Sequence, residues 1–273
     1  MQKEWLMEVR NLGFSYEEGR PVLKDINFGI RQGERIAVVG ANGAGKSTLF
    51  FNMNGVLSPD SGEVFWKGEK VGEKDWKRLR EKVGIVFQNA DEQIIASTVL
   101  SEVAFGPVNQ RLPGEMIQKQ TREAIRYMGL QGMEQRPPHD LSGGEKKRVS
   151  IADILAMKPE IFIFDEPTAA LDPFHIRNLE ETFDRLSMEG KTILVSTHDV
   201  DFAYRFAQRI LVFAHGCLIA DDRPESVFEN ENLRNEARIE KPTLLEISEY
   251  LFQKGWIDHK IYPKTMDELK EMV

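Results

Sequence analysis

The spacing of apolar residues over the first part of the chain predicts an antiparallel β layer. An irregular apolar series over residues 6–14 is followed by a cleaner alternation of apolar and polar residues over 22–30. Gly19 and Gly33 mark the expected turns. Alternation of this kind is typical of strands that bury one face of a sheet.

Three later apolar runs are denser and favour a second kind of strand. Each run ends at a polar residue: residues 84–87 before Gln88, residues 161–164 before Asp165, and residues 192–195 before Ser196. Dense runs of this length suit parallel strands that are covered by helices on both faces. Open α/β sheets bind ligands at the carboxyl ends of their strands, so the three polar residues are expected near a binding site.

A helical pattern replaces the strands between Gln88 and Pro159. Apolar residues recur near helical spacing over 115–128, and a second helix is expected to begin near Ser142. We therefore predict a helical subdomain over about residues 89–159, inserted into one large domain that spans residues 1–235. A further helical pattern, Leu244, Leu245, Ile247 and Leu251, predicts a C-terminal extension over residues 236–273.

Composition limits the classes of protein that fit. The 273 residues are 41% hydrophobic and 29% charged, which suits a globular α/β protein. The net charge of −8 argues against electrostatic capture of nucleic acid or anionic lipid, so any membrane association is expected to run through a protein partner. The single cysteine, Cys217, excludes an intrachain disulfide, and we expect it to pack within a strand.

Residues 40–47 read Gly-Ala-Asn-Gly-Ala-Gly-Lys-Ser, a complete phosphate-binding loop. An apolar run precedes the loop and a helix-like segment follows it, which disfavours a chance glycine-rich turn. Its N–H groups and the helix N-terminus would point at an anion, Lys46 would reach the β- and γ-phosphates of a nucleoside triphosphate, and Ser47 would coordinate Mg²⁺. The residues expected to bind the nucleotide here are Gly40, Ala41, Asn42, Gly43, Ala44, Gly45, Lys46, Ser47 and Thr48.

Two carboxylates follow the dense run over residues 161–164. Asp165 is positioned to hold Mg²⁺, and Glu166 lies just beyond it, where it would polarise the attacking water. The alternative is a pair of surface carboxylates at the start of a loop. The phosphate-binding loop disfavours this alternative, because it already requires an acidic partner for the metal.

A second motif begins at Ser142, which is a plausible N-cap with Glu145 three residues later, as in a capping box. Gly143 and Gly144 leave the first N–H groups of the helix accessible to a phosphate. An ordinary helix start explains the same residues. The pattern therefore predicts at most a second anion site, without saying whose phosphate it binds.

The order of these motifs along residues 6–227 resembles that of the ATP-binding subunits of ABC transporters. Residues 40–47 match Walker A, 141–144 the family signature, 164–168 Walker B, 169–172 the D-loop with Asp172, Gln88 the Q-loop, His198 the switch histidine, and Tyr16 the aromatic residue that stacks on adenine. The resemblance implies an α/β fold. It would consist of a P-loop ABC ATPase core with an antiparallel β layer, a helical insertion subdomain and a short C-terminal helical extension.

The resemblance also implies roles for the site residues. Two subunits would pack head to tail, so that ATP on the P-loop of one is closed over by the region of Ser142, Gly143 and Gly144 of the other. Glu166 would be the general base and His198 the contact to the γ-phosphate.

Gln88 would join Mg²⁺ to the membrane partner, with Ser47 and Asp165 as its fellow metal ligands. Asp172 would belong to the nucleotide interface, and Lys46 would act on the phosphates. Taken alone, His198 would fit a strand-end histidine satisfied by the backbone. We interpret the other histidines as surface or loop residues: His139, His175, His215 and His259.

A narrower resemblance covers residues 87–109 and 241–245, which are similar to the energy-coupling-factor ATPases, with the cobalt-type members closest. Ala90 and Ser101 depart from that pattern, Asp153 stands where a small residue is usual, and Ala170 stands where glycine is usual in the D-loop. The implied protein hydrolyses ATP with Mg²⁺ at the cytoplasmic face of the cell membrane, as a peripheral subunit that drives uptake of cobalt, another metal ion or a vitamin. Its partners would be integral membrane subunits and a second ATPase subunit, either identical or related.

Two alternatives stay open at this point. One is the ATPase subunit of an ordinary ABC importer or exporter. The other is a soluble ABC protein acting on nucleic acid, which a single motif set, the lack of a long basic insertion and the acidic balance disfavour. The transported solute is not determined by the sequence.

The segment that follows Gln88 is unusually apolar. It contains Ile94, Ile95, Val99, Val103 and Phe105. These side chains either form a groove that receives a helix of the membrane subunit or pack the helical insertion onto the core.

Overall fold

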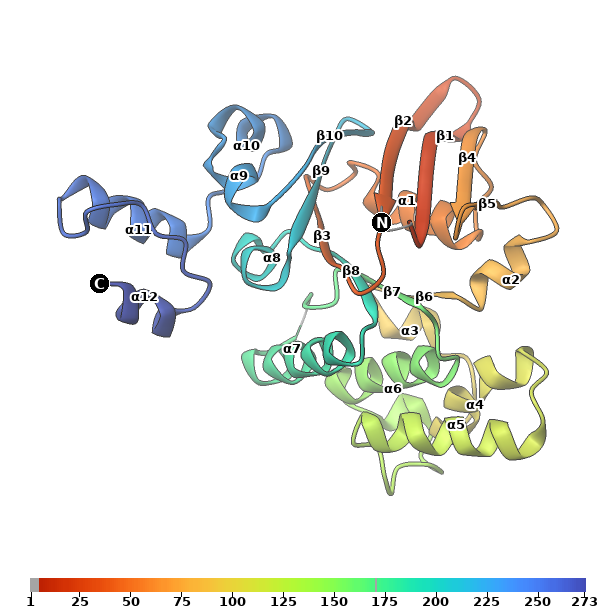
Figure 1. Cartoon of the computed structure of the whole chain (residues 1–273). Coiled ribbons are helices and arrows are strands. Elements are labelled where there is room, and N and C mark those ends of the chain that lie inside the picture. Colours follow the sequence, from red (N-terminus) through yellow and green to blue (C-terminus); the bar gives the residue numbers. More distant parts are fainter. Residues whose placement is uncertain (1–4, 170) are drawn as a thin grey trace.

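The computed structural model describes residues 5–169 and 171–273, and its strands form two sheets (Figure 1). The antiparallel sheet has the order β2-β1-β4-β5: β2 Arg20–Ile30, β1 Met7–Glu17, β4 Ser61–Trp66 and β5 Glu69–Lys70. The second sheet has the order β10-β9-β3-β8-β7-β6: β10 Cys217–Asp222, β9 Arg209–Ala214, β3 Arg35–Val39, β8 Thr192–Ser196, β7 Ile161–Asp165 and β6 Val83–Val86. All of its neighbouring strands are parallel except β10, which runs antiparallel to β9.

The helices fall into groups along the chain. The core helices are α1 Lys46–Asn54, α2 Trp76–Arg80, α7 Pro173–Met188 and α8 Val200–Phe206. A helical group at one end of the molecule comprises α3 Ala90–Gln93, α4 Val99–Asn109, α5 Gly114–Tyr127 and α6 Gly143–Ala156 (Figure 1). The last helices are α9 Pro224–Glu229, α10 Glu231–Ala237, α11 Thr243–Gln253 and α12 Met266–Met272. None of the helices in the described ranges is long and apolar enough to cross a bilayer.

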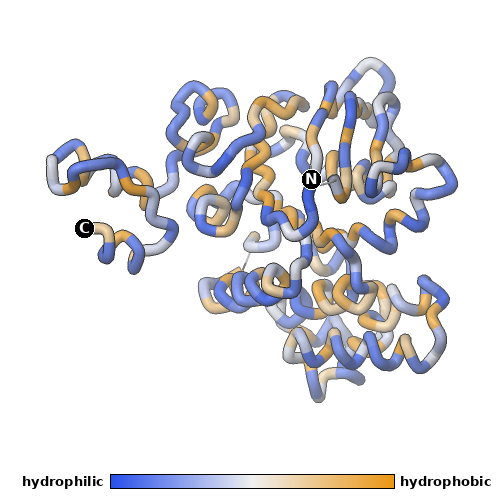
Figure 2. Tube along the Cα trace, in the orientation of Figure 1, coloured by the Kyte–Doolittle hydropathy of each residue, from blue (hydrophilic) through white to orange (hydrophobic). Residues whose placement is uncertain are grey.

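The parallel sheet is buried on both faces, as the dense apolar runs predict. Ile36 and Val38 of β3 face a cluster formed with β1, β2 and α1, whereas Ala37 and Val39 face a cluster formed with α6, α7 and α8. Every residue of β7 and β8 is buried. Figure 2 shows the hydrophobic residues concentrated along these central strands. The mixed α/β fold is confirmed, because continuous apolar strands require cover on both sides.

The irregular apolar series in β1 has a structural cause. The register between β1 and β2 shifts after Val9, and Asn11 adopts a left-handed conformation with φ 50°. Such bulges displace the alternation by one residue, so a strict period of two does not appear in the sequence. The turns expected at Gly19 and Gly33 are confirmed, with φ values of 79° and 78°.

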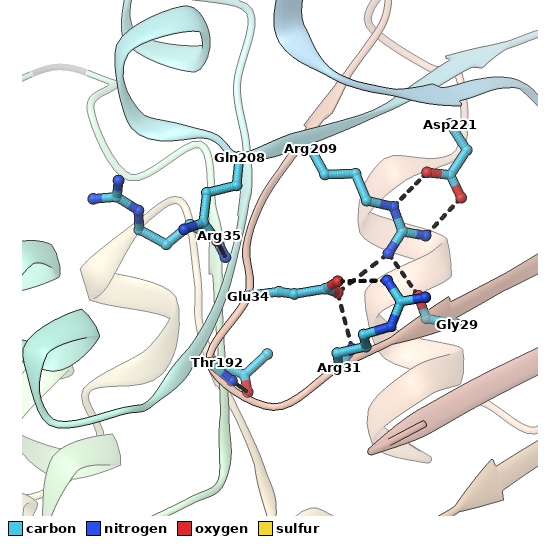
Figure 3. A network of polar contacts seen from close by, with 9 residues as sticks. Gly29, Arg31, Glu34, Arg35, Thr192, Gln208, Arg209 and Asp221 are labelled. Atoms are coloured by element: carbon cyan, nitrogen blue, oxygen red, sulfur yellow. Dashed lines mark hydrogen bonds and ion pairs between the residues drawn. The ribbon is translucent and has the colours of Figure 1, made fainter. Parts of the chain in front are cut away.

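A polar network joins the two sheets (Figure 3). Arg209 in β9 donates to the backbone oxygen of Gly29 at 2.9 Å and pairs with Glu34 at 3.2 Å. The other edge of its guanidinium faces the Asp221 carboxylate in β10, with an Nη2–Oδ2 distance of 2.6 Å. Both oxygens of Asp221 and one of Glu34 are thus held by one guanidinium, a geometry that lysine cannot provide. The network fixes the end of β2 against the edge of the parallel sheet.

The helices predicted from periodicity are present, and the structure adds others. Those over 115–128, after Ser142 and around Leu245 correspond to α5, α6 and α11. The sequence analysis did not assign α4 or the short helices α9, α10 and α12. The region after residue 253 folds back through α12 and encloses a small cluster of Ile257, Ile261 and Leu269. Figure 1 shows α11 and α12 beyond α9 and α10, away from the antiparallel sheet.

The helical group buries an acidic side chain, Asp153, which stands where the resemblance calls for a small residue. Gln93 bridges to it: its amide nitrogen donates to the Ser150 backbone oxygen at 2.8 Å and to Asp153 at 3.3 Å. Burial, aided by the nearby Glu102 carboxylate, raises the pKa of Asp153 from 3.8 to about 7. The folded protein therefore keeps this proton over a pH range in which the unfolded chain releases it, and stability falls as pH rises from about 4 to about 7.

We expect Asp153→Asn to be more stable than the parent at pH 8, by about 1–4 kcal/mol, because the buried charge is gone while the amide oxygen still accepts from Gln93. The advantage should shrink at pH 5, where the parent carboxyl is protonated. Denaturant unfolding at both pH values measures this, with the exposed Asp258→Asn as control. An advantage of equal size at both pH values would contradict the assignment.

Candidate nucleotide-binding site

The loop between β3 and α1 has a shape that demands glycine at its two ends. Gly40 has φ 146° and Gly45 has φ 105°. A Cβ atom on Gly40 would lie 2.1 Å from the backbone oxygen of Phe213, and one on Gly45 would lie 2.9 Å from a methyl of Leu23. Glycine therefore permits both the backbone turn and the close packing against β2 and β9.

Lys46, the first residue of α1, folds back over this loop. Its Nζ atom donates to the backbone oxygens of Gly40 at 2.8 Å and Ala41 at 3.3 Å, and it lies 3.8 Å from Oε1 of Glu166. Burial lowers the pKa of Lys46, while Glu166 and Asp165 act in the opposite direction. A buried ammonium with so few partners is available to a phosphate, which would neutralise it.

The carboxylates after β7 are held by the neighbouring strand β8. Asp165 and Ser196 are partners in the parallel register, and the Ser196 hydroxyl donates to Asp165. The same hydroxyl accepts from the backbone N–H of Glu166 at 2.9 Å. Glu166 itself has a strained φ of 42°, which turns its side chain back toward the loop. The expected gathering of polar residues at this edge of the sheet is confirmed for Asp165 and Ser196.

The two oxygens of Glu166 have different surroundings. Oε2 lies 2.8 Å from Nδ1 of His198 and accepts from the His198 backbone N–H at 3.3 Å. Oε1 is buried, and among the described residues it has no hydrogen-bond partner. His198 is thus satisfied partly by the Glu166 side chain, not by the backbone alone. Oε2 is thus anchored by His198, whereas Oε1 accepts no hydrogen bond within the described chain and faces the Lys46 ammonium at 3.8 Å.

These groups line a single cavity of about 430 Å³. Its lining residues are Val22, Asn42, Gly43, Ala44, Gly45, Lys46, Ser47, Thr48, Gln88, Asp165, Glu166 and His198. Gly40 and Ala41 lie behind the lining and contribute the carbonyls that hold Lys46. Tyr16 stands at the side, with its hydroxyl 3.3 Å from that of Thr48 and its ring 60% exposed. An exposed ring beside a phosphate-binding loop offers a face for a base.

The donor set suits Mg²⁺ held together with a phosphate. Ser47, Gln88 and Asp165 bring hydroxyl, amide and carboxylate oxygens to the cavity. Within the described residues, no group of three or more His, Cys, Asp or Glu side chains is arranged to hold a metal ion. Mg²⁺ commonly binds through one or two carboxylates, with phosphate and water oxygens as its other ligands, so these residues fit that ion.

The second motif, which begins at Ser142, does not line the P-loop cavity of its own chain. Ser142 caps α6: its hydroxyl accepts from the Glu145 N–H at 3.3 Å, and the Glu145 carboxylate accepts from the Ser142 N–H at 2.7 Å. The predicted capping box is confirmed. Ser142 and Gly143 are exposed, while Gly144 is buried. None of these residues, nor Asp172 at the start of α7, lines the cavity of the P-loop.

The sequence analysis did not identify the role of two residues near the site. Ser196 was noted only as the polar end of a strand. Lys147 of α6 donates to the backbone oxygens of Phe87 at 2.7 Å and Gln88 at 3.1 Å, and burial lowers its pKa to about 8. Lys147 therefore ties the helical group to the segment that carries Gln88. No pattern in the sequence separates it from its basic neighbours Lys146 and Arg148, which are only partly buried.

Fold and site together define a P-loop ATPase with a second helix-capped motif, and comparison with known proteins identifies the family. Residues 23–169 match the family model described as ABC transporter. The chain is 44% identical to the energy-coupling factor transporter ATP-binding protein EcfA of Methanothermobacter thermautotrophicus, over 98% of this chain and 88% of that protein. It is 48% identical to a putative ABC transporter ATP-binding protein of Methanosarcina acetivorans, over 92% and 77% respectively. The chain belongs to the ABC transporter family of ATP-binding proteins.

Solved structures give the same result. The chain is similar to cbiO1 from Clostridium perfringens, described as part of the ABC transporter complex cbiONQ, with 35% identity, a TM-score of 0.76, and 93% of this chain and 98% of that chain covered. It is also similar to the ATP-binding cassette MJ0796 in a dimeric post-hydrolysis state with ADP and Pi, with 30% identity, a TM-score of 0.71, and 80% and 98% covered. The protein is thus an ABC-type ATPase of the energy-coupling-factor type, and it binds ATP.

The geometry of the loop predicts that a side chain added at Gly40 destabilises the fold more than one added at Gly43. Gly43→Ala adds a side chain at φ 78° where nothing in the described chain lies within 4 Å, so only backbone strain is expected, about 1 kcal/mol. Gly40→Ala adds a collision with the Phe213 backbone and should lower the free energy of unfolding by about 2–5 kcal/mol. Denaturant unfolding of nucleotide-free protein compares them. Equal losses would show that the contact with Phe213 does not constrain the loop.

Proposed function

We propose that this protein is the ATP-hydrolysing subunit of an energy-coupling-factor importer that moves cobalt, another metal ion or a vitamin into the cell. The observation that carries the proposal is the meeting of Lys46, Asp165, Glu166 and His198 in one cavity with the P-loop. Relatives named EcfA and the neighbour cbiO1 support the transporter assignment, and the resemblance of residues 241–245 to cobalt-type members supports the class of solute.

In this proposal, ATP lies along residues 40–48 with its phosphates at Lys46 and its adenine on the ring of Tyr16. Ser47, Gln88 and Asp165 hold Mg²⁺, which supplies positive charge against the phosphate oxygens. The anchoring of Asp165 by Ser196 fixes the direction of its ligand oxygen.

Glu166 acts as the general base in this proposal. Its Oε2 atom is held by His198, and its Oε1 atom, which accepts no hydrogen bond among the described residues, takes the proton of the attacking water. The His198 side chain is 67% exposed, and its outer edge contacts the γ-phosphate.

A second ATPase subunit, identical or related, completes the site. Ser142, Gly143 and Gly144 lie outside the cavity of their own chain, and exposed N–H groups at a helix start favour an anion. They would therefore act on ATP held by the other subunit, with Asp172 at the same interface. We assign residues 1–235 to the nucleotide-binding domain, with residues 89–159 as its helical subdomain, and 236–273 to the C-terminal extension.

The membrane partner docks on the helical subdomain in this proposal, which places the protein at the cytoplasmic face of the membrane. The apolar set after Gln88 divides by burial: Val99 and Val103 are fully buried and Ile94 is half-buried against the core, while Ile95 is 69% and Phe105 45% exposed. The buried members pack the subdomain, and the exposed ones remain for a partner helix. Val108, 52% exposed, lies one turn beyond Phe105 on α4 and extends the surface.

The rival of a different class, an ABC protein acting on nucleic acid, has less support. The net charge of −8 opposes capture of a polyanion, and we propose no nucleic-acid partner.

Glu166→Gln should keep ATP binding, because Lys46, Ser47 and Asp165 remain, but should slow turnover by roughly two or more orders of magnitude through loss of the general base. The variant should also accumulate as an ATP-bound dimer. Steady-state ATPase assays, equilibrium nucleotide binding and size-exclusion chromatography with ATP measure these effects. Turnover near that of the parent would sink the assignment of the base.

Ile95→Gln and Phe105→Gln should abolish co-purification with the membrane subunit and leave ATP binding by the isolated protein unchanged, since both side chains are exposed. Met188→Gln, which alters an 80% exposed apolar side chain on α7, is the matched control. Loss of ATP binding and thermal stability together with co-purification would instead mean that the segment is part of the core.

A further inference from the structure

The first turn of α6 and the first turn of α7 meet at one histidine. The ring of His175 lies against Gly144 so closely that a Cβ atom on Gly144 would be 2.3 Å from both Cδ2 and Nε2. His175, which the sequence analysis interpreted as a surface or loop residue, is therefore a half-buried helix residue with a defined contact. Only glycine at position 144 leaves room for the ring where it stands.

The opposite edge of the ring is held by Asp172, the N-cap of α7. Oδ1 of Asp172 accepts from the backbone N–H of His175 at 2.9 Å, which is the ordinary cap bond. Oδ2 lies 2.9 Å from Nδ1 of the same histidine. These two bonds, the backbone bond first, lower the pKa of Asp172. Since the carboxylate can only accept, Nδ1 carries a proton and the ring orientation is fixed.

The His175 ring fills the space between Gly144 and Asp172. A cavity of about 390 Å³ lies beside it between α5, α6 and α7, lined by Gly144, Leu171 and His175 among others. The charged groups that line the cavity are Arg126, Lys147, Arg148, Glu181 and Arg185. Of these, Arg148 and Arg185 donate to the backbone oxygens of residues 127–129 at the end of α5. These two arginines therefore hold the end of α5. The side chain that stands between Gly144 and Asp172 is His175.

Gly144 and Asp172 belong to parts of the fold that would both face the second subunit. Gly144 lies in the signature turn of the helical subdomain, and Asp172 lies in the D-loop of the core. We propose that His175 is a positioning residue that sets the distance between these two segments, so that both meet the partner subunit when ATP closes the dimer. The inference rests on the proposed function, and it adds a residue that acts through Gly144 and Asp172 without touching ATP.

Two substitutions of His175 test the two edges of the ring separately. His175→Asn keeps a nitrogen donor near the position of Nδ1, for Asp172, but loses the edge that touches Gly144. His175→Phe keeps the ring against Gly144 but loses the bond to Asp172. Both keep the backbone N–H that forms the cap of α7, so helix capping is unchanged. His259→Asn, at an exposed histidine of the C-terminal extension, is the matched control.

The test measures ATP-driven dimerisation by sedimentation in the Glu166→Gln background. Both His175 variants should need roughly 5- to 10-fold more protein for half-dimerisation, the loss expected for one well-made contact. ATP affinity of the monomer and the melting temperature should stay as in the parent. With Glu166 restored, KM for ATP should rise, while kcat at saturating ATP and high protein concentration should be retained, because mass action restores closure.

The outcomes distinguish the proposals. If either His175 variant dimerises like the parent, one edge of the ring is dispensable and the inference is overturned. It is likewise overturned if monomer ATP affinity or melting temperature falls in parallel, since His175 would then serve folding alone. If the Glu166→Gln parent itself forms no ATP-dependent dimer, the shared site of the proposed function fails and this inference fails with it.

Discussion

The buried approach of Lys46 to Glu166, 3.8 Å apart, is the interaction on which the site depends. Both side chains are at least 90% shielded from water, and each carries a charge that burial disfavours. The charges are tolerable because each has a further partner: backbone oxygens of the loop for Lys46 and His198 for Glu166. A polyphosphate anion entering beside Lys46 would complete this arrangement.

The strand order of the parallel sheet makes this approach possible. β3 delivers the P-loop, β8 delivers Ser196 and His198, and β7 delivers Asp165 and Glu166. The three strands are adjacent in the order β3-β8-β7 although they are far apart in sequence, and parallel pairing places their carboxyl ends together. Ser196 of the middle strand bonds to the Asp165 carboxylate and to the backbone N–H of Glu166, and His198, just beyond the same strand, holds the Glu166 carboxylate.

In the proposed dimer, the same chain also carries the second half of the site. The first turn of α6 is stabilised by its own capping box, Lys147 of the same helix bonds to the Gln88 segment, and Gly144 packs on His175.

Local features of the sequence determined much of this protein. The P-loop, the dense strands ending at Asp165 and Ser196, the cap at Ser142 and the helices α5, α6 and α11 depend on residues close together in the chain, and periodicity and capping chemistry are local. The tertiary structure alone decided which oxygen of Glu166 is free, that Lys147 and His175 join distant segments, and that Val99 and Val103 are core while Ile95 and Phe105 are surface. Each of these outcomes depends on contacts between residues far apart in sequence. Spacing along the chain carries no record of such contacts, because they exist only once the sheets and helices have packed.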